Sequence, residues 1–242
     1  MFKLGFVTDV HGHLADLDAA LVHLRRMGCS AIWCGGDLVA EEGSEAVVSR
    51  LRDENIPTVL GNHELWSLAS RSGEGQGLSP SSKKWLRALP FAHVAELDGV
   101  RVGMIHGDGR GISLGVGKSF GIGSVDVASD WPEQDLSFLL DDLGADVVLV
   151  GHTHDAYTRG LDEGLRLVAN PGACCRLGES YERRSASRRD LRSEAPDCSL
   201  WVPTGRPRRP GFGLLELPGR DFYTYELTDD GQAVRLAAYQ GP

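Results

Sequence analysis

Five short blocks along the first two-thirds of the chain carry side chains that bind metal ions. The blocks are Asp9-Val10-His11, Gly36-Asp37, Gly61-Asn62-His63-Glu64, His106-Gly107-Asp108 and Gly151-His152-Thr153-His154. Five of the eight histidines of the chain lie inside them. Imidazole and carboxylate ligands without thiolate favour Zn, Mn or Fe, and they argue against a cysteine-based structural zinc. The blocks therefore predict a metal site built from distant parts of the chain.

The number and type of these side chains fit a pair of ions. Two bridged divalent ions need about four protein ligands each and one shared oxygen ligand. A carboxylate can bridge, whereas a neutral imidazole has a single free lone pair and cannot. The candidate ligands are two aspartates, one amide and four histidines: Asp9, Asp37, Asn62, His11, His106, His152 and His154. If one aspartate bridges, these side chains supply enough bonds for two ions, and His63 is left over beside a ligand.

The first three blocks follow segments with strand-like patterns. Residues 3–8, 31–34 and 57–60 are short and apolar, and each ends just before a block. Helical patterns separate them, over residues 14–27 with Gly28 as a stop and from Ser44, which is expected to cap the second helix. A β-α-β-α-β order predicts parallel strands joined by helical crossovers. The carboxyl ends of such strands are where α/β sheets place their sites.

The later blocks are positioned in the same way. A helix is expected from Ser79-Pro80 to residue 89, and Asp98-Gly99 predicts a hairpin of strands 94–97 and 100–105 that ends at His106. A long glycine-rich loop, 107–131, precedes a helix from Pro132 to Gly144. Strands are expected at 146–150, which ends at the fifth block, and then at 165–169, 212–217, 222–227 and 233–239.

Composition limits the class of protein. The 242 residues carry a net charge of −9, so there is no overall basic footprint for nucleic acid. No apolar run is long enough to span a membrane. Five cysteines without CxxC spacing favour a reduced, cytoplasmic protein. We see no repeat and no linker, so we expect a single domain over residues 1–242; the sequence does not indicate an oligomeric state.

The ordered set DxH, GD, GNH(E), H and GHTH, over roughly residues 3–172, resembles the calcineurin-like metallophosphoesterases. The resemblance implies an α/β fold, a four-layer α/β/β/α sandwich of two mixed sheets flanked by helices. It implies that one ion is held by Asp9, His11, Asp37 and His154. It implies that the second ion is held by Asp37, Asn62, His106 and His152, with Asp37 as the bridge. His63 would be the catalytic histidine and not a ligand.

The second block narrows the resemblance to one branch. Protein serine/threonine phosphatases carry GDxVDRG, whereas Ala40 stands here in place of the second aspartate and the following arginine is absent. The short chain, the GHTH block and the later Asn170-Pro171-Gly172-Ala173 are more similar to the small bacterial and archaeal phosphodiesterases. Glu41 or Glu42 is a candidate to replace the missing aspartate.

The function implied is hydrolysis of phosphodiesters in small molecules or nucleotides, with a metal-bridging hydroxide as nucleophile and His63 as general acid. The ligand types permit Mn, Fe, Zn, Ni or Co, with manganese as one expectation. One alternative is a phosphomonoesterase acting on nucleotides or small phosphates. Another is a binding scaffold that has lost catalysis, as in a retromer subunit that resembles this family.

Four further features have two interpretations each. His13 is either a substrate contact or an exposed turn residue, and Glu64 either orients the site or favours a helix N-terminus by its charge. The Cys174-Cys175 pair is either redox-sensitive or simply buried. The segment 176–209 carries nine arginines against five acids, net +4. It is either a flap for an anionic substrate, the only route to nucleic acid here, or a solvated insertion.

Overall fold

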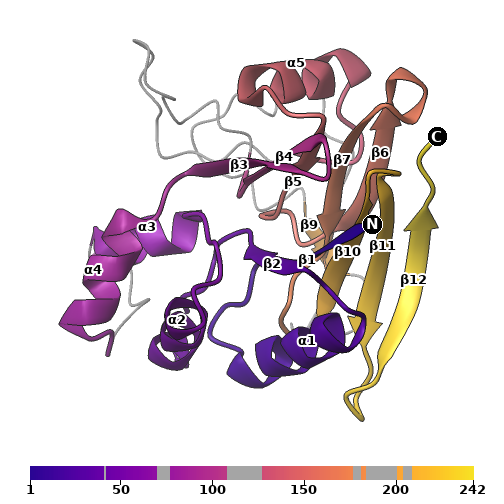
Figure 1. Cartoon of the computed structure of the whole chain (residues 1–242). Coiled ribbons are helices and arrows are strands. Elements are labelled where there is room, and N and C mark those ends of the chain that lie inside the picture. The colour runs from indigo at the N-terminus through magenta and orange to yellow at the C-terminus, as the bar shows by residue number, and fades with distance from the viewer. Residues whose placement is uncertain (41, 70–76, 108–126, 177–180, 184–200, 204–208) are drawn as a thin grey trace.

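Two five-stranded sheets packed face to face, with helices on the outside, form the body of the molecule (Figure 1). The computed structural model describes all residues except 41, 70–76, 108–126, 177–180, 184–200 and 204–208. The first sheet has the order β12-β11-β10-β1-β2, and the second has the order β3-β4-β5-β7-β6. Both sheets mix parallel and antiparallel pairs, as expected from the sequence.

The first sheet combines the N-terminal strands with the end of the chain. Its strands are β1 (Phe2–Val7), β2 (Ala31–Cys34), β10 (Gly211–Leu217), β11 (Asp221–Leu227) and β12 (Ala233–Tyr239). Strands β1 and β2 are parallel, and β10 pairs with β1 in the antiparallel direction. The second sheet consists of β3 (Ala92–Leu97), β4 (Val100–Ile105), β5 (Val147–Leu149), β6 (Ala156–Leu161) and β7 (Arg166–Pro171).

Three apolar clusters give the four layers. Between the sheets, Leu4 and Phe6 of β1 pack with Met104 of β4 and Leu149 of β5. The outer face of the first sheet is covered by α1 (Leu14–Arg26), α2 (Ser44–Asp53) and α4 (Pro80–Ala88). The outer face of the second is covered by α5 (Glu133–Leu143). The predicted α/β/β/α sandwich is therefore confirmed.

Several expected elements differ in detail. Residues 57–60 do not form a third strand; they make a single bridge, Thr58 to Cys34, before the chain turns into α3 (Asn62–Leu68). Ser44 is not a cap: Gly43, at φ 74°, precedes the helix, and the Ser44 hydroxyl hydrogen-bonds the backbone of Ala40. The sequence pattern did not predict β6, and it indicated α3 only through the acidic Glu64 in its first turn. By contrast, Ser79 does cap α4, accepting a hydrogen bond from Ser82 N–H.

Most of the arginine-rich segment 176–209 and of the loop 107–131 lies outside the described residues. Within the former, β8 (Tyr181–Arg183) and β9 (Trp201–Pro203) pair as a two-stranded antiparallel sheet that the sequence did not predict. At its start, Arg176 contacts the carboxylates of Asp16 and Asp229. Among the described helices, none has the length and apolar character needed to cross a membrane.

Candidate metal centre

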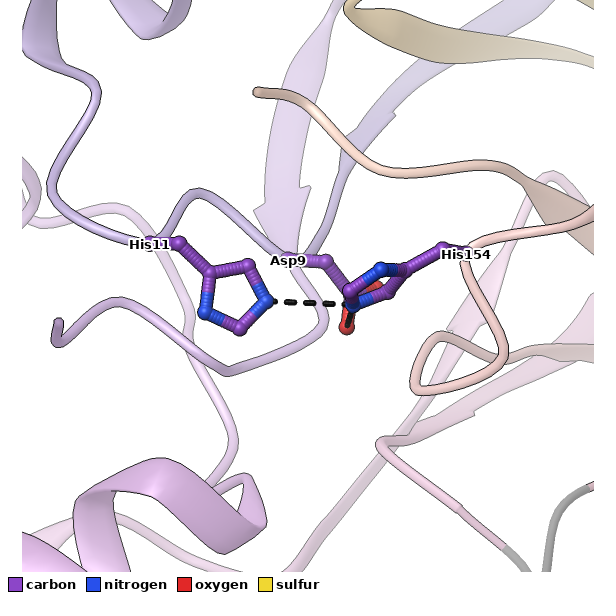
Figure 2. Close-up of side chains that lie close together, drawn as sticks. All are labelled: Asp9, His11 and His154. Carbon is purple, nitrogen blue, oxygen red and sulfur yellow. Dashed lines mark hydrogen bonds and ion pairs between the residues drawn. The ribbon is translucent and has the colours of Figure 1, made fainter. Parts of the chain in front are cut away.

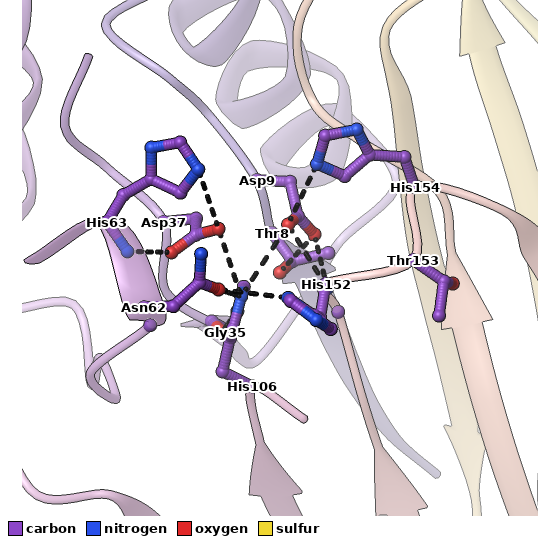
Figure 3. Close-up of polar contacts among 12 residues, drawn as sticks. Thr8, Asp9, Gly35, Asp37, Asn62, His63, His106, His152, Thr153 and His154 are labelled. Carbon is purple, nitrogen blue, oxygen red and sulfur yellow. Dashed lines mark hydrogen bonds and ion pairs between the residues drawn. The ribbon is translucent and has the colours of Figure 1, made fainter. Parts of the chain in front are cut away.

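The side chains of the five blocks meet at one edge of the two sheets (Figure 3). Asp9 and Asp37 lie just beyond β1 and β2 of the first sheet, and His106 and His152 lie just beyond β4 and β5 of the second. Asn62 and His63 form the first turn of α3. Because these strands all end at this edge, the loops that follow them bring distant parts of the chain together, as the sequence predicted.

The backbone at these positions is unusual. Five of the seven predicted ligands adopt a left-handed conformation with φ between 45° and 71°: Asp9, His11, Asp37, His152 and His154. Such angles are uncommon outside glycine and cost roughly 1–3 kcal/mol each, and they concentrate at functional sites. Here they turn each side chain sharply at the end of its strand and toward the centre.

A first group of donors consists of Asp9, His11 and His154, with one ligand atom from each within 4.8 Å of the others (Figure 2). The Nε2 atoms of His11 and His154 are 3.1 Å apart. His154 Nε2 is 3.3 Å from the Oδ1 atom of Asp9. An imidazole–imidazole–carboxylate set of this kind can hold a divalent ion such as Zn or Mn.

A second group, Asp37, His106 and His152, meets the same distance criterion. His106 Nε2 lies 3.0 Å from Asp37 Oδ2. The Asn62 side-chain oxygen lies 3.1 Å from His106 Nε2 and 2.9 Å from His152 Nδ1. Asn62 is therefore placed to add a neutral oxygen donor to this group.

Asp37 lies between the two groups. Its Oδ2 atom is 4.0 Å from His11 Nε2 of the first group and 3.8 Å from His63 Nε2. Asp37, His11 and His63 form a third candidate set of ligands, which the sequence did not predict. All eight predicted site residues are thus brought together.

Hydrogen bonds behind the ligands fix their orientation. His106 Nδ1 is 2.8 Å from the Gly35 carbonyl oxygen, which leaves Nε2 directed at Asp37. The Thr8 hydroxyl donates to Asp9 Oδ2 at 2.8 Å. Asn170, from the Asn170-Pro171-Gly172-Ala173 segment, is buried and donates to the Gly151 carbonyl and to Thr153 Oγ1. Partners of this kind hold ligands in place before an ion binds.

Glu64 connects two of the ligand loops. Its fully buried carboxylate accepts four backbone N–H groups: Oε2 from Asp37 and Gly61, Oε1 from Leu38 and Val39. The two interpretations of Glu64 are both correct, because it accepts from the N-terminal turn of α3 and also holds the loop that carries Asp37.

Two motif glycines allow the loops to approach one another. A Cβ atom on Gly151 would lie 2.1 Å from Thr8 Oγ1 and 2.7 Å from Asp9 Oδ2. A Cβ atom on Gly61 would lie 2.1 Å from Asp37 Oδ1. Any larger residue at either position must therefore displace a ligand or the group that orients it.

The charges of the ligands are strongly coupled. Burial alone would raise the pKa of the Asp9 and Asp37 carboxyls, but the adjacent imidazoles lower both below the usual range. Burial lowers the pKa of His11 to about 4, which leaves a neutral ring with a free lone pair. Burial opposes charge on His106, yet Asp37 raises the pKa of His106 to about 10. An ion that binds to His106 must therefore displace a proton.

The features with two interpretations are partly resolved. Cys174 and Cys175 are fully buried, as small apolar residues would be. The His13 ring lies 3.5 Å from Asp16 and is 41% exposed, which fits a turn residue. Glu42 is exposed, and Glu41 lies outside the described residues. Thr8 and Gly35 were missed because a hydroxyl and a carbonyl beside a ligand have no distinctive sequence signal.

Comparisons with known proteins agree with this geometry. Residues 2–190 match the family model described as the calcineurin-like phosphoesterase superfamily domain. An uncharacterized protein of Methanocaldococcus jannaschii is 31% identical over 70 residues, which cover 28% of this chain and 29% of that relative. The match thus covers only part of that relative's length.

Solved structures share the fold. A metallophosphoesterase from Sphaerobacter thermophilus has a TM-score of 0.54 at 18% identity, covering 100% of this chain and 88% of its own. Vps29 from Chaetomium thermophilum has a TM-score of 0.53 at 16% identity, and the match covers 100% of this chain and 96% of that one. An archaeal phosphodiesterase has a TM-score of 0.51 at 18% identity, and the match covers 97% of this chain and 100% of that one. The similar structures thus include small archaeal and bacterial phosphoesterases.

Proposed function

Since this chain belongs to the calcineurin-like phosphoesterase superfamily, we propose that it hydrolyses phosphodiesters at a centre of two divalent metal ions. The observation that carries the proposal is the position of Asp37. Its Oδ2 atom lies 3.0 Å from His106 Nε2 and 4.0 Å from His11 Nε2, and these two rings belong to different donor groups. A carboxylate in that position can serve as the shared oxygen ligand.

The donor set fits two ions with nitrogen and oxygen ligands. We assign Asp9, His11 and His154 to one ion, Asn62, His106 and His152 to the other, and Asp37 to both. Mn, Fe, Zn, Ni and Co all accept such ligands, so cellular availability selects among them. Two bound ions would lower the pKa of a shared water and neutralise the phosphoryl oxygens.

We assign His63 the role of proton donor to the leaving oxygen. Its Nε2 atom is 3.8 Å from Asp37 Oδ2, so the ring lies beside the centre, and its side chain is 23% exposed, so substrate can reach it. General acid catalysis of this kind is typically worth about 100- to 10,000-fold. The third set of donors, which includes His63, offers it a competing role as a ligand.

Two other functions use the same fold. A phosphomonoesterase acting on nucleotides or small phosphates would need the same donors. A binding scaffold is the second alternative, and the similarity to Vps29 favours considering it. The complete set of donors, with His63 beside them, supports hydrolysis instead. We further propose a cytoplasmic location and a phosphoester small molecule or nucleotide as substrate, with nucleic acid reached only through residues 176–209.

Metal analysis combined with two rates tests the proposal. The purified protein is loaded with Mn or Zn, and turnover is measured on bis(p-nitrophenyl) phosphate and on p-nitrophenyl phosphate. Preference for the diester supports the proposal, and preference for the monoester favours the first alternative. Metal binding without turnover of either substrate would support the scaffold.

A further inference from the structure

Trp66 lies at the outer end of a row of rings that begins at the candidate metal centre. The ring centroids of His11 and His63 are 4.5 Å apart, and those of His63 and Trp66 are 5.0 Å apart. Exposure increases along the row, from 9% at the His11 side chain and 23% at that of His63 to 39% at Trp66. The row therefore leads from a buried ligand to solvent.

The position of Trp66 follows from α3. Trp66 is three residues after His63, and residues at that spacing share one face of a helix. Of the described residues, the three apolar clusters that form the core do not include Trp66. The indole is thus held beside the site without being needed to fill the interior. Tryptophan is enriched at interfaces, where one part of the ring is buried and another part is exposed.

We propose that Trp66 is a specificity-determining residue that stacks on a flat ring in the leaving group of the substrate, such as a nucleobase. The inference rests on the proposed function, because it uses His63 as the proton donor. A donor to the leaving oxygen must contact the leaving group, and the Trp66 ring, which is more exposed than His63, lies 5.0 Å from the same imidazole. A leaving group that extends from the centre toward solvent therefore passes Trp66.

Stacking of a base on an aromatic side chain tolerates any base, because each base has a flat face. Its typical strength corresponds to roughly 5- to 100-fold in affinity. Trp66 could instead only position His63 by packing. These two roles differ in a measurable way: stacking affects ligands with a flat ring, whereas positioning of His63 affects turnover most where the leaving oxygen is strongly basic, whatever the shape of the leaving group.

The test uses the full chain loaded with Mn and two probes, AMP and ribose 5-phosphate, whose binding is measured by calorimetry. We expect AMP to bind more tightly than ribose 5-phosphate to the unaltered protein. Trp66→Leu should lose about 5- to 100-fold in AMP affinity and leave ribose 5-phosphate unchanged. Trp66→Phe should retain most of the AMP affinity. Phe138→Leu, which alters a 55% exposed aromatic on α5, is the matched control and should change neither.

Kinetics provides the second readout. The ratio of variant to unaltered kcat/KM is compared for a diester with a p-nitrophenyl leaving group and one with an alkyl leaving group. A loss confined to the aryl leaving group supports stacking. A loss for the alkyl leaving group that equals or exceeds the loss for the aryl one, or AMP binding that does not depend on Trp66, overturns it. Trp66-dependent AMP binding by a protein that hydrolyses neither diester would support the ring site and contradict the proposed function.

Discussion

The carboxylate of Glu64 accepts the backbone N–H of Asp37 at 2.9 Å, so a buried acid on α3 holds the residue placed between the two donor groups. The same carboxylate accepts Gly61 N–H at the start of that helix. The loop that follows β2 and the loop that precedes α3 are thereby fixed to each other. The position of Asp37 therefore depends on Glu64 as much as on the strand before it.

We expect Glu64→Gln to destabilise the protein and weaken metal binding. The amide nitrogen of glutamine cannot accept, so it leaves two of the four N–H groups unsatisfied at a cost of about 2–5 kcal/mol. Burial raises the pKa of Glu64 to about 7, so chemical denaturation and metal titration should be done at about pH 8. Glu45→Gln is the control, because Glu45 accepts Ser79 N–H far from the donors. Unchanged metal affinity in Glu64→Gln would contradict this role.

His63→Ala should bind metal and lose activity in a way that depends on the leaving group. A proton donor matters most when the leaving oxygen is strongly basic. We therefore expect a loss of about 100-fold or more for an alkyl leaving group and a smaller loss for p-nitrophenolate. Measuring kcat on both substrates, and the metal content of the purified variant, checks this expectation. Loss of metal from the variant would instead make His63 a ligand, as its proximity to His11 and Asp37 permits.

Gly151→Ala should disturb the site more than the fold. The new methyl group would meet Oδ2 of Asp9, a member of the first donor group, and Oγ1 of Thr8, which orients Asp9. Gly103→Ala, on strand β4, is the matched change, because the nearest atom to its added Cβ would be 3.4 Å away, an ordinary contact. Metal affinity should fall by at least about tenfold in Gly151→Ala alone, as for other changes behind ligands. Equal affinities in the two variants would refute the argument from close approach.

Stability of the metal-stripped protein should fall as pH rises from about 7 to about 8.5. The folded pKa of His106, about 10, is above its ordinary value of 6.5. A group whose pKa is higher in the folded protein than in the unfolded chain stabilises the fold fully when the pH is below the unfolded pKa. That stabilisation is lost as the pH rises toward and through the folded pKa. The slope should be on the order of 1 kcal/mol per pH unit. Burial raises the pKa of Glu64 to about 7, so the contribution of Glu64 to the pH dependence of stability ends near pH 7.

Denaturation curves across this range check the expectation, with His106→Asn as the control that should lack the slope. With metal bound the trend should reverse, because protons compete with the ion for His106. A metal-stripped protein whose stability rises over the same range would show that His106 carries no extra proton.

The convergence of the donors could be predicted because four of the five blocks follow a short apolar strand, and parallel strands end at one edge. The strand expected at residues 57–60 was wrong because only Thr58 reaches β2 before the chain enters α3. Strand β6 was missed because its residues are mostly half-buried or exposed and lack alternation.

The supporting interactions could not be predicted from the sequence. Glu64 accepts N–H groups from a loop 25 to 27 residues away, and Asn170 donates to a loop 17 to 19 residues away. No local pattern encodes partners at such separations. The left-handed backbone at Asp9 and Asp37 was likewise invisible, since aspartate is compatible with ordinary conformations as well.

The central claim is that Asp37 joins two metal ions into one hydrolytic centre. Titration of the metal-stripped protein with Mn, with bound metal and rate on bis(p-nitrophenyl) phosphate followed together, tests it most directly. We predict two ions per chain, with activity rising only as the second binds, and loss of both metal and activity in Asp37→Ala. Full activity with one ion per chain, or two ions retained by Asp37→Ala, would contradict the account.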